Sequence, residues 1–151
     1  MRADHRRGGF TLIEVLIVVV IMAVLAATII PQFSSSTQDA KESQLSFNMH
    51  TLRSQIEIYK VHHVGSYPVI TGSDLPQLTS ETNAKGVVNT GASDPDTYPY
   101  GPYVDSELPS NPFSDLNTVA AGTGAAGDGS SGWQYNASTG GIWPNHSGWT
   151  P

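Results

Sequence analysis

The sequence predicts an α+β protein in which one long N-terminal helix packs its second half against a small C-terminal antiparallel β-sheet. Three observations lead to this prediction. An apolar run opens the chain, an amphipathic helical pattern continues it, and a half rich in glycine, proline and aromatic residues follows. With 151 residues and no cysteine, we expect one small head domain that is stabilised by packing rather than by disulfides.

The apolar run covers residues 10–31 and contains a single charge, at Glu14. About 20 apolar residues are enough for a helix to cross the hydrocarbon core of a membrane. Three arginines lie in the basic leader, residues 1–9, and after the run no lysine or arginine occurs before Lys41. The positive-inside bias therefore predicts a single-pass protein with a cytoplasmic N-terminus and an exported remainder.

Three ordinary interpretations compete for this segment. It could be a secretory signal cut after Ala27, a twin-arginine signal built on Arg6 and Arg7, or a plain membrane anchor. None of them explains Glu14, because an ionisable residue inside the hydrocarbon is costly and usually marks function.

The run Arg6-Arg7-Gly8-Gly9, followed by Phe10-Thr11-Leu12-Ile13-Glu14, resembles the cleavage and methylation signature of type IV prepilins and type II secretion pseudopilins. The resemblance implies that a prepilin peptidase of the inner membrane cuts between Gly9 and Phe10. It also implies that the new amine of Phe10 is methylated. The chain is then the substrate of that enzyme and is not itself an enzyme.

Glu14 is expected to act in assembly. A carboxylate at membrane depth needs a cationic partner, and cleavage creates one as the amine on Phe10 of a neighbouring subunit. The alternative is a carboxylate that stabilises the first helical turn and reaches to the membrane interface. Pro31 removes one backbone hydrogen bond, so we expect a helix kink there.

Residues 32–64 are predicted to continue the same helix as its amphipathic half. Gly65 has the position of a C-cap and Pro68 follows soon after, so the helix should end near His63. Apolar residues recur at alternating spacings of three and four, which predicts a stripe that packs on the core, with a self-associating coiled coil as the alternative. The stripe consists of Leu45, Met49, Leu52, Ile56 and Tyr59.

Residues 65–151 are predicted to form a β-rich head with extended loops. Residues 74–78 indicate a short helical turn, and aromatic and branched residues between turn residues indicate three strands. The second and third strands should pair as a hairpin, because the residues between them have the composition of a hairpin loop. The strand candidates are residues 101–104, 132–135 and 141–143.

The order of the C-terminal segments resembles that of G-type major pseudopilins, which commonly hold a calcium ion in a loop between late strands. That resemblance implies Asp115, Asn117 and Asp128 as candidate calcium ligands, and calcium does favour carboxylate and carbonyl oxygens. The stretch between them is rich in glycine and alanine and has no fixed ligand spacing. The residues themselves therefore favour a flexible, solvated loop without metal, with calcium as the alternative that the resemblance implies, and no other cofactor is expected.

Composition and motifs argue against several functions. The net charge is −6, and the excess of carboxylates after residue 30 argues against nucleic acid as a partner. The chain has no nucleophile elbow, no phosphate-binding loop and no HExxH zinc motif, so the sequence offers no catalytic site.

The family resemblance implies a structural function. We expect a subunit that polymerises into the helical filament of a type II secretion system, with itself, prepilin peptidase, the inner-membrane assembly platform and minor pseudopilins as partners. It would lie in the bacterial inner membrane and, after assembly, in a periplasmic pseudopilus. One alternative is an extracellular type IV pilus for adhesion, motility or DNA uptake. The other is an exported or anchored module that binds a glycan through its tryptophans.

Overall fold

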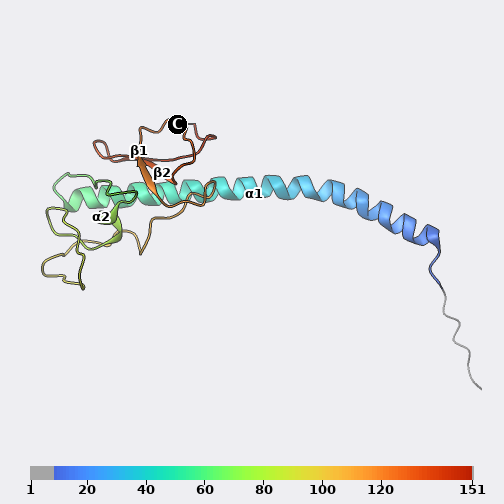
Figure 1. Ribbon diagram of the computed structural model, residues 1–151, viewed down its shortest axis with the longest axis horizontal. Helices are drawn as coiled ribbons and strands as arrows, with labels where there is room; N and C mark the ends of the chain where they lie inside the picture. Colours follow the sequence, from blue (N-terminus) through green and yellow to red (C-terminus); the bar gives the residue numbers. More distant parts are fainter. Residues whose placement is uncertain (1–8, 151) are drawn as a thin grey trace, which may run out of the picture. The chain divides into compact units, whose positions relative to one another are not determined.

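The computed structural model describes the backbone of residues 9–150, and the side chains of residues 28–35 are outside the described set. The chain divides into two compact units, Met1–Ala40 and Lys41–Pro151. The first unit holds the beginning of helix α1, and the second holds the rest of α1, the short helix α2 and a small sheet (Figure 1).

Helix α1 runs from Leu12 to His62, which is close to the predicted range. Its backbone is helical through Pro31. The Pro31 side chain lies outside the described residues, so a kink at this position stays a prediction. In the part of the chain that the structure describes, no helix combines the length and the apolar character needed to span a membrane. The predicted membrane span over residues 10–31 is therefore not confirmed.

The predicted apolar stripe of α1 is confirmed as the centre of the core of the second unit. Leu52, Ile56 and Tyr59 are at most 1% exposed, and the other two members are also buried. Polar side chains add ties between α1 and the head: Asn48 Nδ2 donates to the Ser110 carbonyl at 2.9 Å, and Arg53 donates to the Ile142 carbonyl at 3.2 Å. The stripe packs against residues from every element of the head, namely Leu75, Leu78, Leu108, Val119, Trp133, Tyr135 and Ile142.

The end of α1 is where the sequence places it. Val64 and Gly65 both adopt a left-handed backbone, with φ of 55° and 86°. The Gly65 amide donates to the Lys60 carbonyl at 2.9 Å, which satisfies one of the carbonyls left open at the end of a helix. The predicted helix end near His63 is therefore confirmed.

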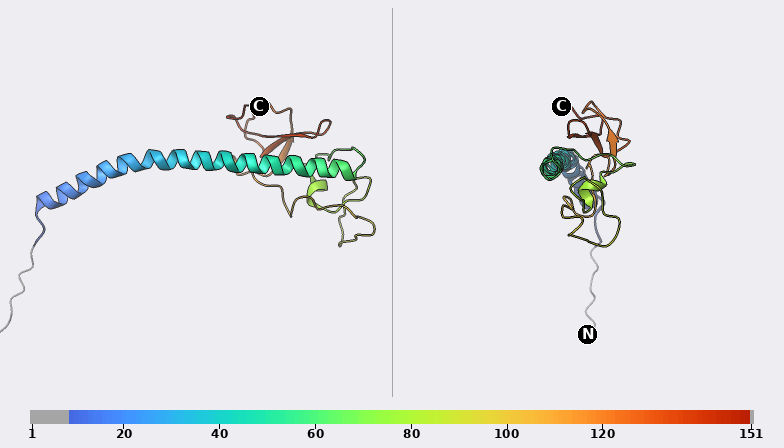
Figure 2. Two further views of the ribbon diagram at one scale, coloured as in Figure 1. Left: turned by 180° about the vertical axis from the view of Figure 1, so that it is seen from behind. Right: turned by 90° about the vertical axis from the view of Figure 1, so that its left-hand side faces the viewer.

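The sheet has three strands in the order β1-β2-β3. Strands β2 (Trp133–Asn136) and β3 (Gly141–Pro144) pair antiparallel, so the predicted hairpin is confirmed. Strand β1 (Val119–Ala121) pairs with β2 in parallel. The prediction of a purely antiparallel sheet was wrong, since the sheet is mixed. In the views of Figure 2, the sheet and α2 lie beside the second half of α1.

Strand β1 lies in the stretch that was expected to be a flexible loop. The glycines on both sides of β1 made this part of the sequence resemble a loop. In the structure these glycines instead allow neighbouring segments to come close to the backbone. A Cβ on Gly132 would lie 2.0 Å from the Leu116 carbonyl oxygen, and one on Gly122 would meet the Gln134 side chain. The loop interpretation was therefore wrong for residues 119–121.

The strand predicted at residues 101–104 does not form. The amides of Tyr103 and Val104 both donate to one acceptor, the Leu78 carbonyl, at 2.8 and 2.9 Å. In a strand, successive amides point in opposite directions, so this shared acceptor excludes a ladder. The segment instead covers α2 (Pro76–Thr79), which confirms the helical turn predicted near this position.

Replacing Leu52 by alanine should destabilise the protein by about 2–5 kcal/mol, because the side chain is fully buried and a cavity would remain. Thermal unfolding of the detergent-solubilised chain, followed by the tryptophan signal, measures this. Ile58→Ala on the same helix is the matched control and should cost less than about 1 kcal/mol, since Ile58 is 41% exposed. Equal losses in the two variants would contradict this description of the core.

Candidate functional site: the start of the long helix

The first turn of α1 is held by a reciprocal pair of residues. The backbone amide and the hydroxyl of Thr11 donate to Oε2 of Glu14, at 2.8 and 2.7 Å. The Glu14 amide in turn donates to the Thr11 hydroxyl at 3.4 Å. This is a capping box, in which an N-cap threonine and a glutamate three residues later satisfy amides that the helix leaves open.

The Glu14 carboxylate is therefore engaged by its own helix in the single chain. This geometry agrees with the alternative in which the carboxylate stabilises the first turn. It does not test the assembly role, because that role needs the amine of a second, processed chain. The sequence analysis singled out Glu14 but missed Thr11, although threonine followed three residues later by glutamate before an apolar run is a known helix-start signal.

The predicted cleavage site lies just before this turn. Gly9 and Phe10 precede α1 and are exposed, with the Phe10 side chain 89% exposed. A peptidase needs its substrate in an accessible, non-helical form, and this peptide bond has that form. Residues 1–8 of the leader lie outside the described residues. Cleavage after Gly9 and methylation of Phe10 stay predictions.

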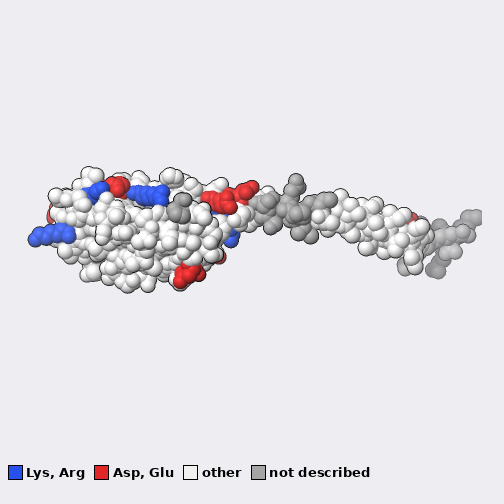
Figure 3. Space-filling view, turned by 90° about the horizontal axis from the view of Figure 1, so that it is seen from above, with Lys and Arg blue, Asp and Glu red and all other residues white. Residues whose placement is uncertain are grey.

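The helix that follows exposes apolar side chains on all sides. Figure 3 shows the face of this segment seen from above as almost free of charged residues. Soluble monomers rarely expose apolar patches of this size, so this surface marks an interaction with a membrane or with other chains. The large side chains that are about half or more exposed are Phe10, Leu12, Ile13, Val15, Leu16, Ile17, Val18, Val19, Val20, Ile21, Met22, Val24 and Leu25.

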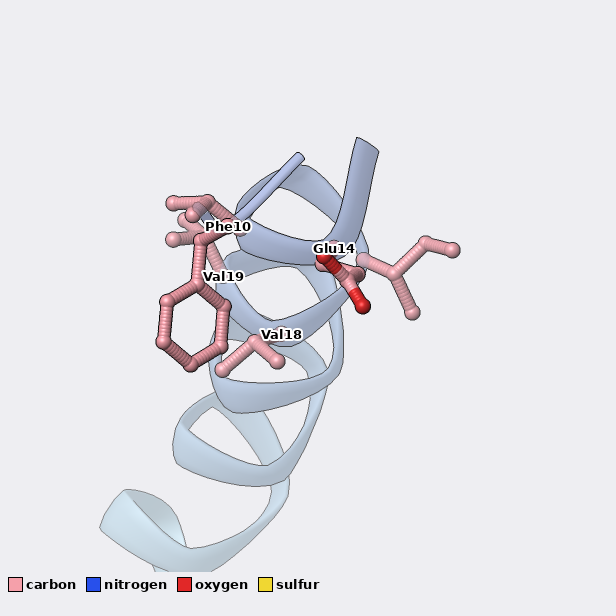
Figure 4. Close-up of a pocket in the computed structure, with 6 residues that line it drawn as sticks. Phe10, Glu14, Val18 and Val19 are labelled. Atoms are coloured by element: carbon pink, nitrogen blue, oxygen red, sulfur yellow. The ribbon is translucent and has the colours of Figure 1, made fainter. Parts of the chain in front are cut away.

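A shallow hollow marks this surface at its start. In Figure 4 the Phe10 ring extends beside the first turns of the helix, with Val18 near it, and the Glu14 carboxylate lies on another side of the same turns. Apart from that carboxylate the lining is apolar, and it also includes Val15, Ile17 and Val19. The arrangement suits contact with apolar side chains and offers no group for catalysis.

The three candidate calcium ligands have different surroundings. Asn117 donates to Glu107 at 3.0 Å and lines a hollow together with Asp74. Asp128 lines another hollow with Asn145, and Asp115 is exposed with a left-handed φ of 56°. Within the described residues, no group of three or more His, Cys, Asp or Glu side chains is placed to hold a metal ion. Calcium binding by these residues stays a prediction.

Asp128 instead belongs to a hydrogen-bond network that the sequence analysis missed. Its Oδ1 accepts from the amide and hydroxyl of Ser130, at 2.9 and 2.7 Å, and from Asn145 Nδ2 at 3.1 Å. Asn145 is buried and also donates to the Ser131 hydroxyl at 2.8 Å. The Ser130 and Asn145 bonds lower the pKa of Asp128 to about 2. The network pins the long loop after β1 to the end of β3.

The tryptophans are used mainly for packing. Trp133 is fully buried, and its indole nitrogen donates to the Pro109 carbonyl at 2.7 Å. The Trp143 ring lies against Gly124 and Gly141, where a Cβ would come within 2.8 and 2.2 Å of it. These contacts favour the core and hairpin role over an open sugar-stacking surface.

Comparison with known families identifies the class of the N-terminal region. Residues 4–30 match the family model described as the prokaryotic N-terminal methylation motif. The matched segment contains the Gly9–Phe10 bond, the Thr11–Glu14 capping box and most of the exposed apolar helix. The chain therefore carries the N-terminal motif of prepilin-type proteins, and the resemblance seen in the sequence is confirmed.

Several curated relatives share one name, type II secretion system core protein G. The chain is 28% identical to the protein from Escherichia coli K12 over 63% of this chain and 70% of that one. It is 29% identical to the Aeromonas hydrophila protein over 74% and 71%, and 28% identical to the Klebsiella pneumoniae protein over 78% of each. No solved structure matches the chain.

The contribution of the Asp128 carboxylate to the stability of the folded protein should be lost in acid. Because the pKa of this carboxyl is depressed to about 2 from an ordinary value near 4, its contribution is present above about pH 4 and is lost as the pH falls toward 2. An NMR titration of the Asp128 carboxyl carbon should show its midpoint near 2. Asn145→Ala removes one donor and should raise that midpoint, whereas Asn136→Ala, at the end of β2, should leave it in place. An ordinary midpoint in the unmodified protein would contradict the network.

Proposed function

We propose that this chain is a structural subunit of a type II secretion system, which polymerises through α1 into the helical filament of a pseudopilus. It is a structural protein rather than an enzyme. The proposal rests on the match to the methylation motif and on the similarity to core protein G from several bacteria.

The exposed apolar surface of α1 is the observation that carries the proposal. A helix that is apolar on all sides cannot be stable in water alone, because burying each large side chain is worth about 1.5–3 kcal/mol. Before assembly, the bilayer can cover residues 10–27. In a filament, the same segment of neighbouring copies can replace the lipid. The capped first turn presents the Phe10 end of the helix to that contact.

The other expected partners follow from this function. Prepilin peptidase would cut after Gly9, and an inner-membrane assembly platform with minor pseudopilins would start and drive polymerisation. The precursor would reside in the bacterial inner membrane with residues 1–9 in the cytoplasm, and the assembled filament in the periplasm. The head, residues 41–151, would form the outer surface of the filament.

The first test is the intact mass and N-terminal sequence of the protein isolated from host membranes. We expect a chain that begins at Phe10 and carries a methyl group on its amine, because the motif and the accessible Gly9–Phe10 bond fit the peptidase. A chain that begins after Ala27, or one that retains Met1, would overturn the proposal.

The second test removes the charge of Glu14. Glu14→Gln keeps the size of the side chain and an acceptor for Thr11, so the helix start and processing should be retained. Filament formation should fall at least about tenfold, since the charged contact to the Phe10 amine is lost. Electron microscopy and shear release of filaments measure this.

Glu57→Gln is the matched control for that experiment. Glu57 is an exposed carboxylate on the same helix that pairs with Lys60 at 3.4 Å, and its loss should leave filaments unchanged. Normal filaments from the Glu14→Gln chain would show that Glu14 acts only through its own first turn.

A further inference from the structure

The second half of α1 has an apolar stripe on the side opposite to the core. At 3.6 residues per turn, its positions 47, 51, 54, 58 and 61 fall on one face, about half a turn away from the buried stripe. Phe47 is 67% exposed, Ile58 is 41% exposed and Val61 is 77% exposed. Thr51 and Ser54 lie between these large residues, and the face contains no charge. We call these five residues the outward stripe.

The outward stripe has a natural counterpart in the same chain. Among the described residues, the other continuous run of exposed apolar side chains is the N-terminal part of α1. Residues 12–26 and residues 47–61 have the same length, about 22 Å at 1.5 Å per residue. Both are uncharged along the matching face, apart from Glu14 in the first turn.

The two segments also match in side-chain size at four of the five facing positions when they run parallel, and the exception is Leu12, which faces the large Phe47 at the start of the contact. Positions 12, 16, 19, 23 and 26 have the same three-and-four spacing as the outward stripe. Leu16 and Val19 then face the small Thr51 and Ser54. Farther along, the small Ala23 and Ala26 face the large Ile58 and Val61. Alternating large and small residues across facing positions is how two helices approach closely and interdigitate.

An antiparallel arrangement is complementary at only two of the five facing positions. Leu12 and Leu16 would then face the large Val61 and Ile58, while Ala23 would face the small Thr51. The facing large side chains would hold the helices apart and leave a gap at the facing small ones, and both overpacking and cavities are costly.

We infer that the outward stripe is the docking surface for residues 12–26 of a second copy of this chain, bound parallel and in this register. The inference rests on the proposed polymerisation and names the surface that receives the apolar helix. The contact is heterologous, since each copy uses one patch to donate and another to accept. It therefore leaves both kinds of patch free at the ends and propagates without closing.

The absence of cysteine from the sequence allows a direct test by cross-linking. The full-length chain is expressed in its host with the pair Leu16→Cys and Thr51→Cys, or with Val19→Cys and Ser54→Cys, and is oxidised in intact filaments. A disulfide forms only when the two Cα atoms lie within about 7 Å of each other. Because every copy carries both cysteines, we expect a ladder of covalent multimers in denaturing gels.

Two variants check face and direction. The first variant combines Leu16→Cys with Ser46→Cys. Ser46 is also small and exposed on α1, but it lies about 100° around the helix from the outward stripe. This pair should give at least about fivefold less of the covalent ladder than Leu16→Cys with Thr51→Cys. Leu16→Cys with Ile58→Cys reports the antiparallel arrangement and should give no ladder above that control. Adding Phe47→Asp to Leu16→Cys with Thr51→Cys should weaken its ladder at least about fivefold, because a charge would enter the contact.

The outcomes separate this inference from the proposed function. A ladder equal to that of the Ser46 control, or a stronger ladder with Ile58, overturns the docking surface. Filaments visible by electron microscopy without any ladder also overturn it, while the function as a polymer subunit stands. Failure of the unmodified, correctly processed chain to form filaments overturns both.

Discussion

The structure depends on the way α1 divides its surface. One side of its second half is buried by the head, and this burial fixes where α2 and the sheet lie. In the first half, the described residues 12–27 are exposed, and most of them are apolar. A single helix thus supplies the core of one unit and an uncovered apolar surface in the other. Folding of the head and assembly of copies use the same physical force at different positions along one element.

The head achieves order with very little regular structure. Its three strands are three or four residues long, and most of the chain between them is irregular. Side chains of Asn111, Asn145 and Asp128 bind backbone and side-chain groups across the loops. Trp133 and Tyr135 are buried and donate to carbonyls at 2.7 and 3.0 Å. Buried polar groups need such partners. These hydrogen bonds therefore fix the conformation of the loops where the packing of the hydrophobic core does not.

Periodic features of the sequence were predictable and the close backbone contacts were not. The stripe of α1, its end near Gly65 and the β2–β3 hairpin follow from local spacing and turn residues. Strand β1 is only Val-Ala-Ala and depends on its parallel partner, so no local pattern identifies it. Residues 101–104 have the residue types of a strand, but two of their amides donate to the Leu78 carbonyl instead of to a neighbouring strand. At the start of the chain, Gly9, Phe10 and Glu14 could be singled out because they belong to a recognisable motif, which residues 4–30 match. The Asp128 network joins residues that are far apart in the sequence, so no local sequence pattern predicts it.

The ties between α1 and the head have a mechanical consequence. Asn48 and Arg53 bind carbonyls on different segments of the head, and the buried stripe runs alongside them. Force applied along the helix would load these bonds and the stripe side by side rather than one after another. Contacts loaded in parallel share the force, so sliding the helix out of the head requires all of them to break together. A subunit pushed or pulled through its helix would therefore move its head as one body.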